Sequence, residues 1–163
     1  MEFKKYLKVK KKKANIFVLF SKIIYSDDKS ISNVDKNLLV SEKYGVCGKP
    51  DYVIKTIFGN YIPIELKSSN IKEKDFPHEN EIMQLITYFT LVNENYGKVK
   101  RGFLVYNDYM FIVKNNIHST KLFEMILKDM RNIIETGEGE CEPNFTKCKN
   151  CICRGSVCEF CKK

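Results

Sequence analysis

The sequence predicts a mixed α/β fold, and three features of its 163 residues support that class. Short runs rich in β-branched and aromatic residues lie between positions 38 and 67 and again between 101 and 113. Two longer segments, at about 79–95 and 119–136, repeat apolar residues at helical spacing. The order is therefore strands, helix, strands, helix. That order favours a sheet flanked by helices over a helical bundle or a sandwich.

The N-terminal segment is the least defined part of the pattern. Residues 1–13 are basic and are expected to be frayed or to form an exposed helix start. Residues 14–25 are apolar and aromatic, and they fit a buried strand or a short helix because periodicity does not separate the two. The polar residues 26–36 form a loop.

Three strands and a hairpin are predicted in the next part of the chain. The strand candidates are Leu38–Tyr44, Cys47–Phe58 and Tyr61–Lys67. Gly59-Asn60 is a tight-turn signal, so the last two strands are expected to pair as a hairpin. The polar residues 68–80 then form a connection with the character of a mobile flap.

Two amphipathic helices and a second strand pair complete the core. The first helix is expected to end at Tyr96-Gly97 and the second at Gly137. Strands at 101–106 and 110–113 lie between them, with Asn107-Asp108 at the turn. The apolar stripe of the first helix is Ile82, Leu85, Ile86, Phe89 and Val92. The stripe of the second is Leu122, Met125, Ile126, Met130, Ile133 and Ile134. We expect one core domain over 1–137 and a cysteine-rich tail over 138–163.

Charge and hydropathy indicate a polyanionic partner and a cytoplasmic protein. The formal net charge is +8, which suits phosphate-rich ligands, although a run of lysines is also a common solvated surface. No apolar stretch approaches the ~18 residues that cross a bilayer. Lys10–Lys13 precede the apolar run Ala14–Phe20, but Ser21-Lys22 interrupts that run and no small-residue cleavage site follows. We therefore expect no membrane partner.

A carboxylate–lysine constellation is the main functional signal. Gly48-Lys49-Pro50-Asp51 precedes the hairpin turn, and Glu65-Leu66-Lys67 follows it. Side chains two apart on a strand share a face, so Glu65 and Lys67 are expected to project together while Leu66 faces the core. The turn would bring Asp51 back beside them. Glu-x-Lys alone is as well explained by an exposed cross-strand ion pair, and Pro-Asp at hairpin distance favours a site.

Two carboxylates and an ammonium in one small volume suit phosphodiester hydrolysis. Oxygen ligands bind Mg²⁺ or Mn²⁺, here through Asp51, Glu65 and the backbone carbonyl of Leu66. Such a metal ion activates water and neutralises phosphate. Lys67 would stay off the metal and assist the nucleophile. Lys49, Lys55 and Lys72 are candidates for leading the substrate in.

Gln84 and Tyr88 add a second signal on the following helix. Residues four apart share one helical face, so the amide and the hydroxyl point the same way. Together they are candidates for holding a phosphate of the substrate. A half-buried tyrosine beside a solvated glutamine explains the pair equally well when it is taken alone.

The cysteines are concentrated at the C-terminus, which favours metal ligation in a reducing compartment over disulfides. Cys148-x-x-Cys151 and Cys158-x-x-Cys161 form two chelating pairs, with Cys141 and Cys153 as alternates. Two such pairs suit a zinc site or an iron–sulfur cluster. Cys47, alone in the body, is expected to be a small buried core residue.

The ordered motifs resemble the RecB-like nucleases of the PD-(D/E)XK class. The set is Gly-Lys-Pro-Asp at 48–51, Glu-Leu-Lys at 65–67, Gln84-x-x-x-Tyr88 and Gly102-Phe103-Leu104-Val105-Tyr106. It is most similar to the CRISPR-associated exonuclease group (the Cas "four" type) and its Dna2-like relatives. The resemblance implies a restriction-endonuclease-like mixed central sheet flanked by helices. It also implies metal-dependent cleavage of DNA, often exonucleolytic on single strands, and possible partnership with CRISPR integrase proteins in spacer acquisition.

The same resemblance implies a [4Fe–4S] cluster in the tail. Cys148, Cys151 and Cys158 match the family's C-terminal trio, with Cys161 or Cys141 in place of an N-terminal cysteine. The family's upstream histidine is also missing. His78 and His118 both lie downstream and are expected to be a surface residue and a structural residue, respectively.

The sequence therefore predicts a Mg²⁺- or Mn²⁺-dependent DNA exonuclease of CRISPR spacer acquisition or DNA repair. Two alternatives remain open at this stage. One is a weakly active or inactive nuclease-fold module that binds DNA or a partner protein, because the chain lacks the family's upstream histidine and cysteine. The other is a zinc-ribbon protein that binds RNA, in which Asp51 and Glu65 are incidental.

Overall fold

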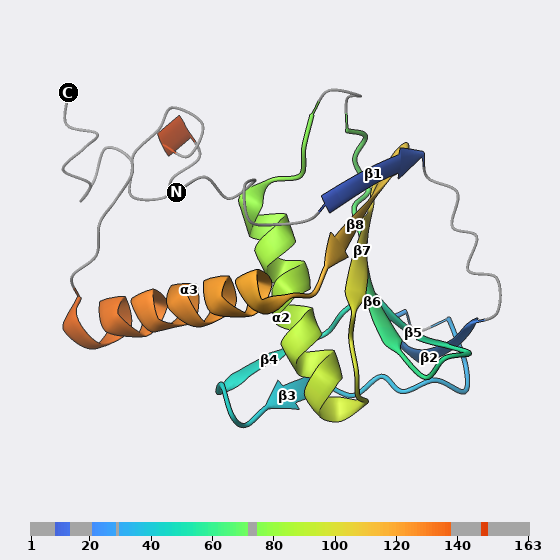
Figure 1. Cartoon of the computed structure of the whole chain (residues 1–163), viewed down its shortest axis with the longest axis horizontal. Helices are drawn as coiled ribbons and strands as arrows, with labels where there is room; N and C mark the ends of the chain where they lie inside the picture. Colours follow the sequence, from blue (N-terminus) through green and yellow to red (C-terminus); the bar gives the residue numbers. More distant parts are fainter. Residues whose placement is uncertain (1–8, 14–20, 29, 72–74, 138–147, 150–163) are drawn as a thin grey trace. The chain divides into compact units, whose positions relative to one another are not determined.

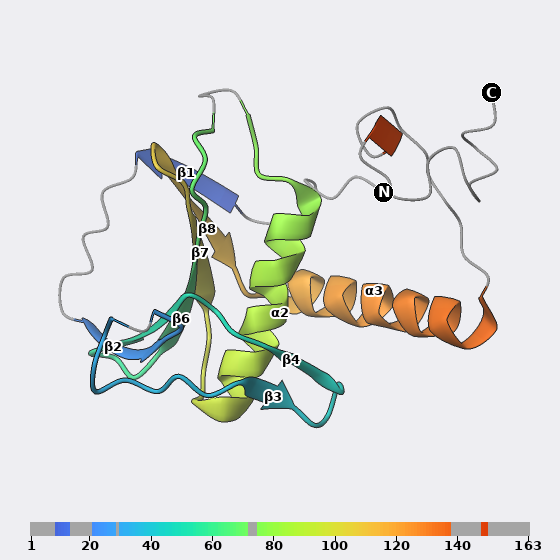
Figure 2. The same cartoon turned by 180° about the vertical axis from the view of Figure 1, so that it is seen from behind.

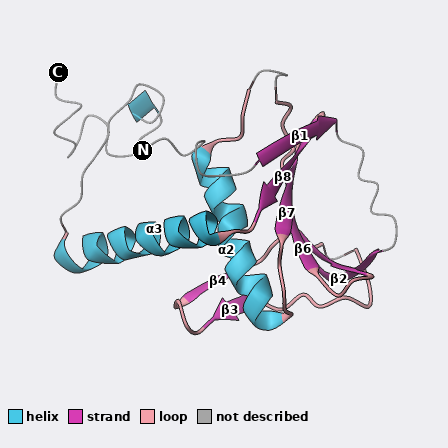
Figure 3. Ribbon diagram, in the orientation of Figure 1, coloured by secondary structure: helices cyan, strands magenta, loops and turns pink. Residues whose placement is uncertain are grey.

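The computed structural model describes residues 9–13, 21–28, 30–71, 75–137 and 148–149 (Figure 1). The chain divides into two compact units, Met1–Met125 and Ile126–Lys163. The strands of the described residues and helix α2 belong to the first unit, and helix α3 begins there. The mixed α/β class predicted from the sequence is confirmed (Figure 3).

The core of the first unit is a six-stranded mixed sheet in the order β1-β8-β7-β6-β5-β2. Strands β6 and β7 are parallel, and the other neighbouring pairs of this sheet are antiparallel. A separate two-stranded ribbon is formed by β3 and β4. The strands are β1 Val9–Lys13, β2 Ser21–Ser26, β3 Leu39–Ser41, β4 Val46–Gly48, β5 Tyr52–Thr56, β6 Tyr61–Leu66, β7 Arg101–Val105 and β8 Tyr109–Lys114.

The N-terminal expectation was wrong for residues 9–13. They form β1, which pairs antiparallel with β8 from Val9 opposite Val113 to Lys13 opposite Tyr109. The physical reason is the open edge of β8, whose backbone groups need partners that a strand supplies and a helix does not. The pattern of side chains in a lysine run carries no such information. Residues 21–26 are a strand, one of the two forms left open for 14–25.

The predicted strand Cys47–Phe58 is two strands in different sheets. It is divided at Pro50, which has no N–H to donate and a fixed φ. β4 lies in the small ribbon, whereas β5 joins the main sheet. The predicted hairpin between β5 and β6 is confirmed, with Thr56 and Asn60 bonded across the turn. Gly59 has φ +72°, a conformation that glycine adopts without strain.

Helix α2, Glu79–Asn95, covers one face of the sheet (Figures 1 and 2). It packs on β6 and β7 and also contacts β3 and β4. All five residues of its predicted apolar stripe are buried: Ile82, Leu85, Ile86, Phe89 and Val92. Gly102 of β7 allows the close approach, since a Cβ there would lie 2.5 Å from Phe89 Cε1 and 2.9 Å from Leu85 Cδ1. The helix is thus fixed on the sheet at van der Waals distance.

The other sheet face carries a second apolar cluster. Its buried members come from β5, β6, β7 and β8: Ile54, Ile62, Ile64, Phe103, Val105 and Met110. Alternation along β6 places Ile62, Ile64 and Leu66 on this face, and Pro63 and Glu65 on the face that α2 covers. The face of β6 under α2 therefore carries the carboxylate of Glu65, whereas the opposite face is apolar.

Helix α3, Ile117–Thr136, is formed as expected, but its predicted stripe is not buried. Within the described residues of this helix, Ser119 and Phe123 are the buried ones, and Met125, Met130, Ile133 and Ile134 are exposed. Periodicity shows that a face is apolar, and it does not supply the surface that covers that face. None of the described helices is long and apolar enough to cross a lipid bilayer.

The loop after β2 is fixed by Asp35, which gives a testable pH dependence. Tyr96 donates a hydrogen bond of 2.6 Å to Asp35 Oδ2, and Asp35 pairs with Tyr25 through the backbone. This bond, with the backbone N–H of Asn37, lowers the pKa of Asp35. A lowered pKa in the folded state contributes stability above the unfolded value of 3.8 and loses it as the pH falls below that value.

Replacement of Tyr96 by phenylalanine removes this hydrogen bond and is therefore expected to destabilise the protein near pH 7. The expected loss is only about 1 kcal/mol, because solvent screens this partly exposed bond. The loss should shrink as the pH falls from 7 to well below 3.8, because protonation of the wild-type carboxyl removes the charge that strengthens the bond from Tyr96. Urea unfolding of both proteins across this range measures it. A loss that is equal at both ends of the range would contradict the assignment to the ionised carboxylate.

Candidate active site

The β5–β6 hairpin brings Asp51 beside the end of β6. Tyr52 lies opposite Ile64, so the residue before β5 meets the residues that follow Ile64. The Leu66 N–H donates to Asp51 Oδ2 at 2.6 Å. The predicted return of Asp51 to this place is thus present in the structure.

Glu65 and Lys67 project to the same side, as expected from strand alternation. Lys67 Nζ lies 3.0 Å from Glu65 Oε1. The prediction that Leu66 faces the core was wrong, because its side chain is 42% exposed. Both faces of β6 bury side chains, and α2 covers the face that carries Glu65. Leu66 lies on the other face, but it is the last residue of the strand and stands at the end of the apolar cluster there.

Glu65 is a buried carboxylate with one free oxygen. The residue is 6% exposed, and Oε2 has no hydrogen-bond partner among the described residues. Burial raises the pKa of Glu65, the Lys67 ammonium opposes that rise, and the nearby Asp51 adds to it. An unpartnered buried carboxylate oxygen costs free energy unless a cation or a donor reaches it.

Gln84 and Tyr88 extend this group from α2. Lys67 Nζ donates to Gln84 Oε1 at 3.0 Å, and Gln84 Nε2 donates to the Tyr88 hydroxyl at 2.9 Å. The Tyr88 hydroxyl in turn donates to the Lys49 carbonyl at 3.1 Å. The shared face predicted for the pair is confirmed. Their polar atoms form a chain of hydrogen bonds that holds the Lys67 ammonium in place, and Gln84 is the member of this chain that contacts it.

Gly48 and Pro50 explain why Tyr88 reaches the strand connection. A Cβ on Gly48 would lie 3.2 Å from the Tyr88 ring and from Leu91 Cδ1, so the glycine makes room for both. Pro50 is fully buried. Burial is also the main cause that raises the pKa of Tyr88. The Gly-Lys-Pro-Asp motif thus serves the packing of α2 as well as the position of Asp51.

Sequence reasoning missed Tyr25 and Asp27. The Tyr25 side chain is fully buried, and its hydroxyl has no hydrogen-bond partner among the described residues. Burial, with the charges of Asp27, Asp35 and Asp51, raises the pKa of Tyr25 to about 12. Asp27 pairs with Lys49 at 3.4 Å, and its N–H donates to the Asp51 carbonyl. No sequence signal marks these residues as part of a site, because Tyr25 lies in an apolar strand and Asp27 in the polar loop that follows it, both outside the motifs.

The donor set fits a hard divalent cation in part. The free Glu65 Oε2, the second oxygen of Asp51 and the Leu66 carbonyl are oxygen donors of the kind that Mg²⁺ and Mn²⁺ prefer. In the part of the chain that the structure describes, no three His, Cys, Asp or Glu side chains gather in one such group. Mg²⁺ commonly uses one or two carboxylates and keeps several waters, so two carboxylates suffice.

The predicted cysteine site lies mostly outside the described residues. That holds for Cys141, Cys151, Cys153, Cys158 and Cys161. Cys148 is half-buried and not in a disulfide. The expectation for Cys47 was wrong, because its side chain is exposed. It lies in the middle of β4 and points away from α2, since Gly48 beside it faces the helix.

The other residues named from the sequence occupy the surface where they are described. His78 precedes α2 and His118 lies in the first turn of α3, and both are exposed. Lys49 is held by Asp27, and Lys55 lies 5.5 Å from the centre of the Tyr61 ring. Lys72 lies outside the described residues.

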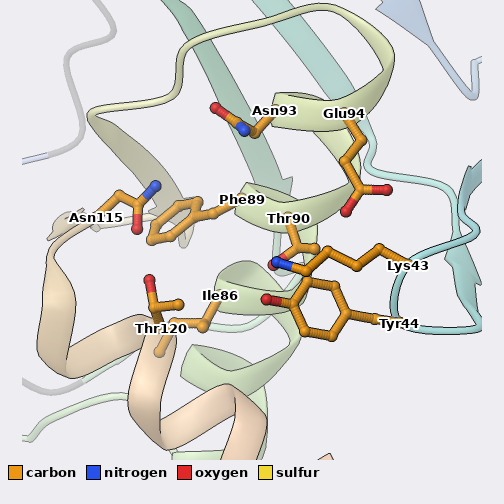
Figure 4. A pocket seen from close by; sticks show the side chains of 9 residues that line it. All are labelled: Lys43, Tyr44, Ile86, Phe89, Thr90, Asn93, Glu94, Asn115 and Thr120. Atoms are coloured by element: carbon orange, nitrogen blue, oxygen red, sulfur yellow. The ribbon is translucent and has the colours of Figure 1, made fainter.

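A hollow of about 380 Å³ lies beside α2 (Figure 4), and its lining includes neither Gln84 nor Tyr88. Its lining includes Ile86, Phe89 and Asn93 of the helix, facing Tyr44 and Thr120. Its polar groups are largely occupied within the fold. The Tyr44 hydroxyl donates to Glu124, Glu94 accepts from Ser41, and Asn115 donates to Val99. We therefore place the candidate site at Glu65 and not in this hollow.

Comparisons with known proteins leave the family open. No protein-family profile matches the chain, and no curated protein matches it. Among solved structures, the crystal structure of SSO0001 is similar with a TM-score of 0.49 and 18% sequence identity. The match covers 88% of this chain and 60% of that chain, so this chain spans about three fifths of the neighbour's length. A likeness of this size assigns neither a family nor an activity.

Proposed function

We propose that this chain is a divalent-metal-dependent deoxyribonuclease with a restriction-endonuclease-like core, acting as an exonuclease on single-stranded DNA. One observation carries the proposal. Asp51, Glu65 and Lys67 meet at the end of β6, and a buried oxygen of Glu65 lacks a partner there. An ordinary surface ion pair would leave no buried carboxylate oxygen unsatisfied.

The residues divide the work as follows. Asp51, Glu65 and the Leu66 carbonyl would hold Mg²⁺ or Mn²⁺, which supplies charge neutralisation at phosphate and a more acidic water. Lys67 is fixed between Glu65 and Gln84, so its ammonium has one defined direction. From there it orients the attacking water and stabilises the charge that develops on the phosphate oxygens. Tyr88 and Gln84 keep Lys67 in that position.

The cofactor and partner proposals rest on the motifs and the resemblance. We propose that Cys148, Cys151, Cys158 and Cys161 hold a [4Fe–4S] cluster, with Cys141 and Cys153 as alternate ligands and zinc as the alternative metal. Iron, sulfide and zinc analysis of anaerobically purified protein separates the two. DNA is the proposed partner, and association with CRISPR integrase proteins is proposed from the resemblance alone.

An anaerobic cleavage assay tests the activity. Single-stranded DNA labelled at either end is incubated with the full chain, with Mn²⁺, with Mg²⁺ or with EDTA. We expect cleavage that depends on the metal ion and shortens the strand progressively from one end. Titration calorimetry with Mn²⁺ should show binding to the same protein. Metal binding without cleavage would favour the non-catalytic module, and cleavage undiminished in EDTA would contradict the proposed site.

A further inference from the structure

A second hollow, of about 420 Å³, lies at the other end of the β5–β6 hairpin. Five of its residues belong to the hairpin and its turn: Thr56, Phe58, Asn60, Tyr61 and Ile62. Three cations complete its lining: Arg101 from β7, Lys114 from β8 and Lys100 from the segment before β7. We call this group the hairpin hollow.

The cations of the hairpin hollow are placed by the backbone. Arg101 and Lys114 lie directly opposite each other in the β7–β8 pair. The Lys100 carbonyl accepts the N–H of Asn115, which fixes the segment before β7. Arg101 also lies over the Phe103 ring, 5.8 Å from its centre. The backbone therefore places Arg101 and Lys114 side by side, with Lys100 next to Arg101 in the lining of the same hollow.

This arrangement includes a repulsion between like charges, which a bound anion would relieve. Like charges directly opposite on neighbouring strands repel each other. The described lining of the hollow includes no acidic residue. The ion pairs found among the described residues join Lys49 to Asp27 and Lys67 to Glu65, and neither involves the three cations of the hollow. A phosphate group bound between Arg101 and Lys114 would remove the repulsion, and guanidinium binds phosphate with two parallel hydrogen bonds.

An aromatic ring stands beside these cations. Phe58, at the tip of the hairpin, is 84% exposed, which is unusual for so large an apolar side chain. Tyr61 also belongs to the lining, but it is half-buried and its ring stacks on Tyr96 at 5.9 Å, so Phe58 is the ring that is open to a base. Cations that follow a phosphate backbone, combined with exposed rings on which bases stack, are the usual equipment for binding single-stranded nucleic acid.

We infer that the hairpin hollow is a second nucleic-acid subsite, which takes phosphates of a single strand on Arg101 and Lys114 and stacks one base on Phe58. The choice of nucleic acid among polyanions rests on the proposed function. The subsite is separate from the carboxylate site. Tyr61, at the hollow, and Glu65 are four residues apart on β6, which is about 13 Å along a strand. The side chains of Arg101 and Ile62 also lie on the sheet face opposite to Glu65.

An anionic lipid surface is the competing occupant, and the geometry favours a strand of nucleic acid. Interfacial membrane anchors bury a continuous apolar face of a helix in the headgroup region. Here Ile57 and Phe58 are the exposed apolar pair at the turn, while the cations line a concave hollow behind them. A concave cationic surface fits a narrow polyanion better than it fits a flat layer of headgroups.

Binding without metal tests the inference independently of cleavage. A short labelled single strand is titrated with the full chain in EDTA at several salt concentrations, with fluorescence anisotropy as the measurement. We expect the double variant Arg101→Ala/Lys114→Ala to lower affinity at least about tenfold and to reduce the slope of log K against log salt by about 1.4, since each phosphate contact to a single strand contributes about 0.7.

Phe58→Ala gives the second measurement. The substitution removes an exposed side chain, so folding is not at risk. It should lower the affinity for the single strand about tenfold. The slope of log K against log salt should stay unchanged, because stacking releases no counterions. The matched control is Lys121→Ala/Lys128→Ala, which removes the same charge from exposed positions of α3. Unfolding curves verify that each variant is folded.

Three results would overturn the inference. The first is no binding by the wild-type chain, and the second is an equal loss of affinity in the control and in Arg101→Ala/Lys114→Ala. The third is an unchanged affinity both in Phe58→Ala and in Arg101→Ala/Lys114→Ala. Sedimentation with phosphatidylglycerol vesicles provides the competing outcome. Binding to vesicles that depends on Arg101 and Lys114, without binding to DNA, would assign the hollow to a membrane surface. Hollow-dependent DNA binding by a chain that never cuts DNA would support the subsite and refute the nuclease.

Discussion

Replacing Glu65 with glutamine is expected to reduce DNA cleavage at least about 100-fold while the protein remains folded. Glutamine keeps the shape of the side chain and can still accept the hydrogen bond of Lys67 Nζ. It removes the charge that would bind the metal ion. Because burial already raises the pKa of this carboxyl, the neutral amide should cost the folded state little. Single-turnover cleavage with Mn²⁺ and thermal unfolding measure the two effects.

Glu79→Gln is the matched control for this variant. Glu79 lies in the first turn of α2 and is exposed, so the same chemical change is made at the surface of the same unit. The control should cleave DNA at the wild-type rate. Asp51→Asn should behave like Glu65→Gln, since the amide still accepts the Leu66 N–H. Cleavage at the wild-type rate in either site variant would remove the carboxylates from the mechanism.

Replacing Gly102 with alanine is expected to destabilise the protein by about 2–3 kcal/mol, towards the upper end for overpacking a core. The added Cβ would lie 2.5 Å from Phe89 Cε1 and 3.1 Å from the Pro63 carbonyl oxygen. The ring belongs to α2 and the oxygen to the backbone of β6, so the helix and the sheet must separate. Urea unfolding measures the loss.

A double-mutant cycle isolates the cause. Phe89→Leu removes the ring edge that the new Cβ meets, so Gly102→Ala should cost less in that background than in the wild type. Gly59→Ala is the control for glycine itself, because nothing lies within 4 Å of its Cβ position and its cost comes from φ +72° alone. Additive losses in the cycle would show that the ring is not what limits the approach of α2.

The Gly102 variant also connects packing to the candidate site. Displacement of α2 moves Gln84 and Tyr88, which hold Lys67 through hydrogen bonds of about the normal length. Cleavage should therefore fall more in Gly102→Ala than in Gly59→Ala. Their residual folded fractions are matched by choice of temperature for this comparison.

Local sequence signals were sufficient for the parts of the fold that depend on nearby residues. Gly59-Asn60 marked the hairpin turn, and the apolar stripe of α2 marked its buried face. From these two features the grouping of Asp51, Glu65 and Lys67 followed, because a tight turn fixes which residues meet across a hairpin.

Signals that depend on distant partners were not readable in this way. β1 forms because β8 presents an open edge more than 90 residues away in sequence, where Val9 lies opposite Val113. Leu66 is exposed because it is the last residue of β6, beyond Ile62 and Ile64, which are buried on the same face. The stripe of α3 is apolar but exposed, since its sequence specifies a face and not a partner.

The sequence by itself determined the α/β class, the hairpin and the three residues that the hairpin gathers, because each of these follows from short-range backbone geometry. Only the tertiary structure decided that Glu65 is buried with a free oxygen, that Gln84 and Tyr88 hold Lys67, and that Arg101 faces Lys114 beside Phe58. Burial and contact between separate elements depend on which surfaces meet, and the spacing of residues along a chain does not record that.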